Sequence, residues 1–166
     1  MRIVLVGYMG SGKSTAGKKL ASKLGFSFLD TDLLIEEEYK ISISNFFEKY
    51  GEDVFRRIER NILKEALLNE NVVISTGGGT PCILDNMALI NKSSFSVYIK
   101  MHINSIENRL MNSKKPRPLI KDISQADLRS FIEKQIFERE KYYNQANLII
   151  KGENIDINSI MEALRI

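Results

Sequence analysis

The feature that most limits the fold is an apolar run, Ile3–Val6, followed at once by Gly-Tyr-Met-Gly-Ser-Gly-Lys-Ser-Thr from Gly7 to Thr15. Gly-x-x-x-x-Gly-Lys-Ser between a strand and a helix is the P-loop pattern, in which backbone N–H groups and a helix N-terminus face phosphate oxygens. Lys13 would reach the β- and γ-phosphates of a nucleotide, and the Ser14 hydroxyl would bind Mg²⁺. A chance glycine-rich turn is the alternative. The nucleotide-binding residues predicted here are Gly10, Ser11, Gly12, Lys13, Ser14 and Thr15.

Strand-like and helix-like segments alternate along the chain. Short apolar runs predict strands at Ile3–Val6, Phe26–Leu29, Val72–Ser75, Phe95–Lys100 and Leu148–Ile150. Helical patterns occupy Lys13–Lys23, Asp32–Lys40, Glu52–Leu68, Asn104–Met111, Gln125–Gln145 and Asn158–Leu164. This alternation predicts an α/β fold in three layers, a parallel sheet flanked by helices, with ligands beyond the carboxyl ends of the strands.

Length and composition indicate an ordinary globular domain. The 166 residues contain no repeat or linker, so we expect a single domain over 1–166, with 43% hydrophobic and 27% charged residues. A net charge of +3 does not suggest a nucleic-acid partner, and no apolar run approaches a membrane span of about 20 residues. Cys82 is the one cysteine, which excludes an internal disulfide. We therefore expect a cytoplasmic protein made in its final form.

Other sequence motifs narrow the class of P-loop protein. The chain lacks the Asn-Lys-x-Asp guanine motif of Ras-type GTPases and the Leu-Ser-Gly-Gly-Gln signature of transport ATPases. It is also too short for most motor ATPases. A small-molecule or nucleotide kinase remains.

Two acidic residues, Asp30 and Asp32, follow the second predicted strand. Alternate residues of an extended segment point the same way, so both carboxylates could face the γ-phosphate. One could hold Mg²⁺ through water, and the other could accept or orient a substrate hydroxyl. Alternatively, Asp30 or Thr31 merely caps the following helix.

The third predicted strand ends in Gly77, Gly78 and Gly79, with no carboxylate at the place where many P-loop proteins carry an Asp. Bare backbone N–H groups there suit the close approach of an anion or a sugar-like ring. A flexible turn leading to Pro81 is the alternative.

Two arginines lie toward the apolar faces of predicted helices. Arg56 borders one such face, and Glu59, three residues later and within that face, could hold its guanidinium. Arg139 continues the stripe of Leu128, Ile132 and Ile136 near the end of its helix. Arginines in this position predict a substrate carboxylate. The alternatives are snorkelling side chains and a cation that stabilises a helix C-terminus.

A basic, proline-containing segment at about 112–123 is predicted to form a mobile lid. Arg117, between Pro116 and Pro118, is the expected phosphate clamp. The alternative is a solvated charged loop.

Together these pieces resemble the shikimate kinases. The matching segments are GYMGSGKST, FLDTD, FRRIE, STGGGTP, RPLI and REKYY, in the family's order from Gly7 to Tyr143. The resemblance implies a five-stranded sheet in the order 2-3-1-4-5, as in nucleoside monophosphate kinases. It also implies transfer of the γ-phosphoryl of ATP to the 3-hydroxyl of shikimate, with Mg²⁺, in aromatic amino-acid biosynthesis. A monomer is expected.

The resemblance also implies residue roles. Asp32 would contact the reacting hydroxyl, with Lys13 and Arg117 as the other catalytic residues, and Asp30 would help Ser14 place Mg²⁺. The substrate-binding region would span about 32–60, and the residues holding shikimate would be Asp32, Arg56, Gly77, Gly78, Gly79 and Arg139. Arg109 would lie along adenine, with Asn154 nearby. A kinase of another hydroxy acid, such as gluconate, and a non-catalytic nucleotide-binding regulator are the alternatives.

Overall fold

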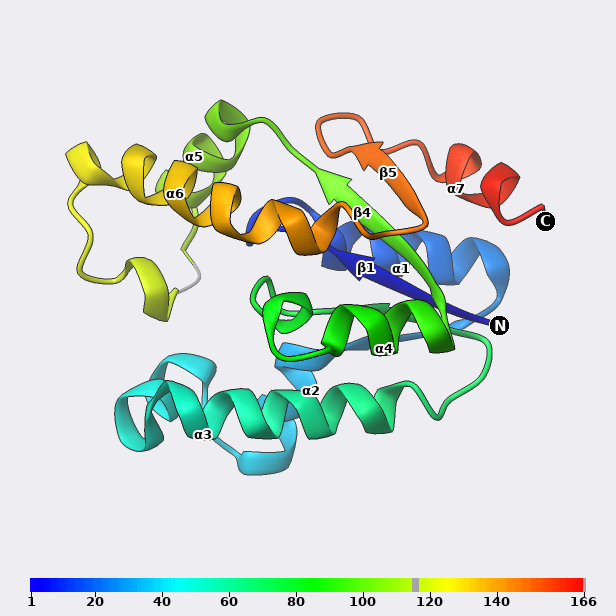
Figure 1. The fold of residues 1–166 in the computed structure, drawn as a ribbon, viewed down its shortest axis with the longest axis horizontal. Helices are drawn as coiled ribbons and strands as arrows, with labels where there is room; N and C mark the ends of the chain where they lie inside the picture. The colour runs from blue at the N-terminus through cyan, green and yellow to red at the C-terminus, as the bar shows by residue number, and fades with distance from the viewer. Residues whose placement is uncertain (115–116, 166) are drawn as a thin grey trace.

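The computed structural model describes residues 1–114 and 117–165. Its five strands form one parallel sheet in the order β2-β3-β1-β4-β5, as predicted (Figure 1). The strands lie at nearly the expected positions: β1 Arg2–Val6, β2 Ser27–Asp30, β3 Val72–Ser75, β4 Phe95–Lys100 and β5 Leu148–Lys151.

Helices connect the strands and cover both faces of the sheet. They are α1 Lys13–Leu24, α2 Thr31–Tyr39, α3 Ile43–Ala66, α4 Asn86–Ser93, α5 Ile103–Met111, α6 Gln125–Tyr143 and α7 Ile157–Ala163. Two short 3₁₀ turns, η1 Thr80–Cys82 and η2 Pro118–Ile120, lie in the connections. No helix in the described part of the chain is long and apolar enough to cross a membrane.

Alternation along the strands divides the core into two layers. Val4 and Val6 of β1 pack with α3, α4, α5 and α6, whereas Ile3 and Leu5 pack with α1 and α7. Every one of these four side chains is fully buried, which explains why β1 reads as a continuous apolar run rather than an alternating one. A third cluster, between α2 and α3, contains Ile35, Phe46, Phe55 and Ile62.

Two helical elements differ from the prediction. Helix α3 already begins at Ile43, capped by the Ser42 hydroxyl, and is kinked at Gly51, whose φ of 78° lies in the left-handed region. The predicted start at Glu52 marks only its second segment, because the glycine interrupts the apolar periodicity. Helix α4 was not predicted, since its eight residues are too few to show a clear helical period.

The carboxyl ends of β1, β3 and β2 lie side by side, because β1 pairs with β3 and β3 pairs with β2 in parallel. The P-loop, the triple glycine and the two acids therefore meet at one edge of the sheet. The predicted lid at 112–123 also reaches this edge through Arg117 and η2, while residues 115 and 116 lie outside the described part. Its mobility stays a prediction.

Candidate active site

The P-loop wraps around its own lysine. Gly10 and Gly12 have φ angles of 79° and 96°, a conformation that favours glycine, and Gly12 directly precedes α1. The Lys13 ammonium is buried and donates hydrogen bonds of 2.9 Å to the carbonyls of Gly7 and Tyr8. Burial lowers the pKa of Lys13 to about 8, with Asp32 and Asp30 opposing this effect. A less basic lysine therefore lies at the centre of the loop.

A cavity opens over the P-loop and contains most of the predicted nucleotide residues. Ser11 and Asn154 do not line it. Ser11 is buried, and its hydroxyl has no hydrogen-bond partner among the described residues. The predicted site residues that line this cavity are Gly10, Gly12, Lys13, Ser14, Thr15, Asp30, Asp32, Gly77, Gly78, Arg109 and Arg117.

Asp30 has two sets of contacts, one for each role considered from the sequence, which were capping the following helix and helping to form a metal site. One carboxylate oxygen accepts the N–H of Asp32 at 3.1 Å and so caps α2. The other accepts the Ser14 hydroxyl at 2.6 Å, and the Ser75 hydroxyl lies 3.3 Å from Ser14. Hydroxyl and carboxylate oxygens thus gather beside the phosphate loop.

A second cavity adjoins the first and is lined by residues of the predicted acceptor site. Arg56 and Arg139 enter it from α3 and α6, and Phe47 and Phe55 supply apolar walls. Its remaining predicted residues are Asp32, Gly77, Gly78 and Gly79, with Arg117 at the lid side.

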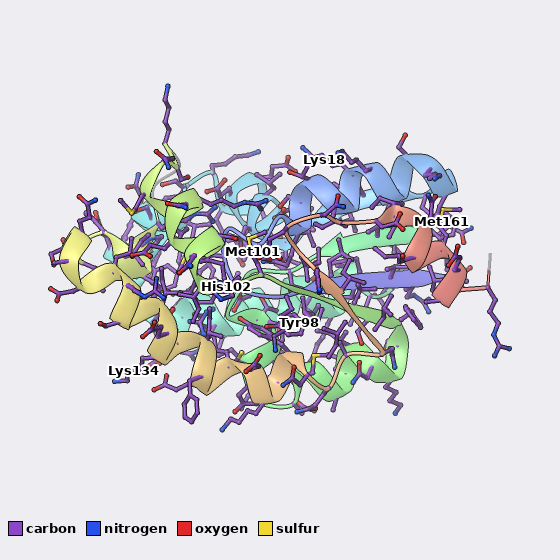
Figure 2. The ribbon with its side chains drawn as sticks, turned by 90° about the horizontal axis from the view of Figure 1, so that it is seen from above. Lys18, Tyr98, Met101, His102, Lys134 and Met161 are labelled. Carbon is purple, nitrogen blue, oxygen red and sulfur yellow. The ribbon has the colours of Figure 1, made fainter. Side chains whose placement is uncertain are left out.

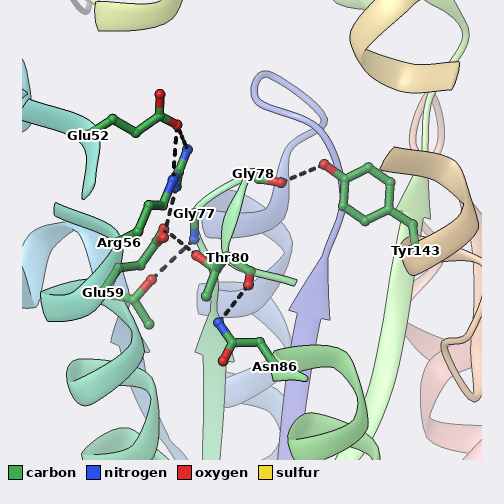
Figure 3. A network of polar contacts seen from close by, with 9 residues as sticks. Glu52, Arg56, Glu59, Gly77, Gly78, Thr80, Asn86 and Tyr143 are labelled. Atoms are coloured by element: carbon green, nitrogen blue, oxygen red, sulfur yellow. Dashed lines mark hydrogen bonds and ion pairs between the residues drawn. The ribbon is translucent and has the colours of Figure 1, made fainter. Parts of the chain in front are cut away.

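Arg56 is held rigidly. Its guanidinium pairs with the buried Glu59 at 2.8 Å and with the exposed Glu52 at 3.1 Å (Figure 3). Burial opposes the charge of Arg56, but the two carboxylates outweigh burial and raise its pKa. Glu59 also accepts the Thr80 hydroxyl at 2.5 Å, which ties α3 to the turn after β3. The predicted pairing of Arg56 with Glu59 is therefore present.

The triple glycine leaves room for the charged side chains around it. A Cβ on Gly77 would lie 2.8 Å from carboxylate oxygens of both Asp32 and Glu59. A Cβ on Gly79 would lie 2.6 Å from both terminal nitrogens of Arg56. A side chain at Gly77 or Gly79 would therefore displace these charged groups, so the two glycines are needed here for the space that they leave.

The two cavities share a boundary. Met9, Asp32, Gly77, Gly78 and Arg117 line both of them. The Nε atom of Arg117 is buried and has no hydrogen-bond partner among the described residues. A buried donor of this kind indicates a place for an anion.

The two residues predicted to lie near adenine line a third cavity, next to the P-loop. Arg109 donates to the Gly10 carbonyl at 3.1 Å, and it lines both this cavity and the phosphate cavity. Asn154 lies in the same cavity with Gly12 and Thr15. The structure thus brings the two predicted adenine residues to one place.

Several lining residues were not predicted as members of the site. Met9, Pro118 and Leu119 are apolar neighbours of predicted residues and lie inside the GYMGSGKST and RPLI segments. Glu36 lines the acceptor cavity and accepts the Ile43 N–H at 2.9 Å, which orders the α2–α3 connection. His102, at the start of α5, lines neither of the two adjoining cavities, and its Nδ1 accepts the Asn104 N–H at 3.2 Å (Figure 2).

Comparisons with known proteins agree with this geometry. The model of the shikimate kinase family matches residues 9–165. A shikimate kinase of Azobacteroides pseudotrichonymphae is 48% identical, covering 98% of this chain and 96% of its own. The crystal structure of shikimate kinase from Bacteroides thetaiotaomicron has a TM-score of 0.94 at 37% identity, covering 100% and 99% of the two chains.

A second solved structure, shikimate kinase from Acinetobacter baumannii in complex with shikimate, has a TM-score of 0.88 at 29% identity over 99% of this chain and 90% of its own. A gluconokinase from Sinorhizobium meliloti is only 14% identical with a TM-score of 0.58, so it shares the fold alone. Because the family model matches most of the chain and a shikimate kinase is 48% identical over nearly its whole length, the chain belongs to the shikimate kinase family.

Proposed function

We propose that the two adjoining cavities hold ATP and shikimate, and that the phosphoryl group passes between them at Asp32. The observation that carries this proposal is the shared boundary, where Asp32 and Arg117 line both cavities. The chain is an ATP-dependent shikimate kinase by family, so the donor is ATP and the acceptor is shikimate. The proposal concerns which residues carry each part of the reaction.

On the donor side, Lys13 and the P-loop amides hold the β- and γ-phosphates, and Arg117 approaches the γ-phosphate from the lid. The buried Nε of Arg117 supports this role, because an anion would satisfy it. Together the two cations stabilise the negative charge that develops on the transferring group.

Mg²⁺ fits beside the Ser14 hydroxyl and the Asp30 carboxylate. Both are hard oxygen ligands, and they already lie 2.6 Å apart. When bound, Mg²⁺ would neutralise charge on the phosphates. Asp30 also caps α2, so its position does not depend on the metal.

On the acceptor side, Asp32 receives or orients the proton of the 3-hydroxyl. Arg56 and Arg139 hold the carboxylate of shikimate, and Gly77, Gly78 and Gly79 present backbone groups to the ring. The buried partner of Arg56 supports this role, because Glu59 holds the guanidinium at the cavity wall before substrate binds.

The test is a coupled assay of ADP release with ATP, Mg²⁺ and either shikimate, its 3-deoxy analogue or gluconate. We expect turnover with shikimate only. Asp32→Ala should abolish turnover while it still binds ATP. Equal turnover of gluconate, or wild-type kcat in Asp32→Ala, would contradict the assignment. We expect the enzyme to be a monomer and to be located in the cytoplasm.

A further inference from the structure

Tyr143 lies behind the acceptor cavity, in the last turn of α6, and its side chain is completely buried. Its hydroxyl donates a hydrogen bond of 2.5 Å to the carbonyl of Gly78 (Figure 3). In that view the glycine turn has Tyr143 on one side and Arg56 with Glu59 on the other. The turn is therefore fixed from both sides.

The hydrogen bond to Gly78 sets the direction of the neighbouring amide. A trans peptide unit is planar, so its C=O and N–H point in opposite directions. With the Gly78 carbonyl directed at Tyr143, the N–H of Gly79 is directed away from Tyr143, toward the side on which Arg56 lies. Gly78 and Gly79 both line the acceptor cavity.

Tyr143 also lies beside the second arginine of the acceptor cavity. Arg139 precedes it by one helical turn, on the same face of α6. Burial raises the pKa of Tyr143 far above its usual value, and Arg139 is close enough to counteract part of that rise. The phenol is thus neutral at physiological pH and can donate its proton to Gly78. The guanidinium carbon of Arg139 lies 5.5 Å from the centre of the Tyr8 ring.

The Tyr143 hydroxyl thus contacts the glycine turn and also lies beside Arg139. We propose that Tyr143 is a positioning residue for shikimate: its hydroxyl orients the Gly78–Gly79 peptide and supports Arg139, so that both present donors to the carboxylate end of the substrate. This inference rests on the proposed role of Arg139 and the glycines.

The test is Tyr143→Phe, which keeps the ring and removes the hydroxyl. We expect the KM for shikimate to rise about three- to tenfold, as for the loss of one hydrogen bond, with kcat and the KM for ATP changed by less than about twofold. The matched control is Tyr98→Phe, because Tyr98 is buried and its ring packs 5.1 Å from that of Tyr143. It should leave all three parameters unchanged.

A second readout separates positioning from general damage to the fold. In amide NMR spectra, Tyr143→Phe should shift the Gly79 resonance and Tyr98→Phe should not. Equal effects of the two variants on the shikimate KM, or a parallel rise in the KM for ATP, would overturn the proposal. If Tyr143→Phe unfolds at the assay temperature, the comparison is made in the cold, where a purely structural defect disappears and a positioning defect persists.

The role of Arg139 itself is tested separately with Arg139→Ala. If this variant retains the wild-type KM for shikimate, the proposed carboxylate site is wrong. If it loses affinity while Tyr143→Phe does not, only the role of Tyr143 is refuted.

Discussion

Replacing Glu59 by glutamine should destabilise the protein far more than the same change at Glu52, although both carboxylates bind Arg56. Glu59 is 1% exposed and accepts two hydrogen bonds, at 2.8 Å from Arg56 and at 2.5 Å from Thr80. Glutamine has one oxygen and one donor group in place of two oxygens. One of the two partners would therefore face an N–H group instead of an acceptor.

The size of the effect follows from these contacts. Removing one partner of a buried ion pair costs about 3–5 kcal/mol. Arg56 keeps its bond to Glu52, and its side chain is 13% exposed, so we expect the lower end of that range. For a domain of this length a loss of about 3 kcal/mol lowers Tm by roughly 6–12 °C. Glu52 is 56% exposed, and Glu52→Gln should cost less than about 1 kcal/mol.

The assay is thermal unfolding of the wild type and both variants, followed by circular dichroism at one pH and salt concentration, with the shikimate KM measured in parallel. Glu59→Gln should lower Tm and raise this KM, because Arg56 and the turn at Thr80 both lose their common anchor. Equal Tm values for Glu59→Gln and Glu52→Gln would refute the reasoning. So would a lowered Tm with an unchanged KM, since Arg56 would then not depend on Glu59.

Three further predictions concern the reaction. Asp32→Asn should reduce kcat by about 10²–10⁴-fold while calorimetry still detects ATP binding, because it removes a proton acceptor and not a phosphate ligand. Gly79→Ala should raise the shikimate KM with little change for ATP, since its Cβ would lie 2.6 Å from the Arg56 guanidinium. Lys13 has a pKa of about 8, and the phosphates of a nucleotide favour its charged form. A non-hydrolysable ATP analogue should therefore bind with constant affinity below pH 8 and up to tenfold more weakly for each pH unit above it. Above pH 8, calorimetry should also detect proton uptake on binding. Affinity that stays constant up to pH 9.5 or so would contradict this account of Lys13.

Much of the fold could be predicted because its strands are buried on both faces. Continuous apolar runs such as Ile3–Val6 are distinctive, and alternation with helices then implies a parallel sheet. The order of the strands came from the family resemblance instead, since no local pattern encodes which strand lies beside which. Helix α4 and the first segment of α3 were not predicted because neither shows a long helical period. Helix α4 is short, and α3 is interrupted at Gly51.

The predictable parts of the site are those whose signal is local. The P-loop carries its glycines, its lysine and its serine within Gly7–Ser14, so one segment is enough to identify it. Arg56 and Arg139 could be singled out because a charge on an apolar helix face needs a partner. The geometry of Arg56 was predictable only as far as Glu59, its neighbour in the same helix.

The acceptor side differs because its contacts join distant segments. Tyr143 and Gly78 are separated by 65 residues, and Glu59 and Thr80 by 21. The triple glycine looked like a backbone suited to an anion, but Gly77 and Gly79 also make room for carboxylates and a guanidinium that come from α2 and α3. That requirement depends on the packing of helices against the turn, which no motif records. Substitutions far from the P-loop in sequence should therefore alter shikimate binding more readily than ATP binding, since acceptor contacts such as Tyr143–Gly78 and Glu59–Thr80 join different elements.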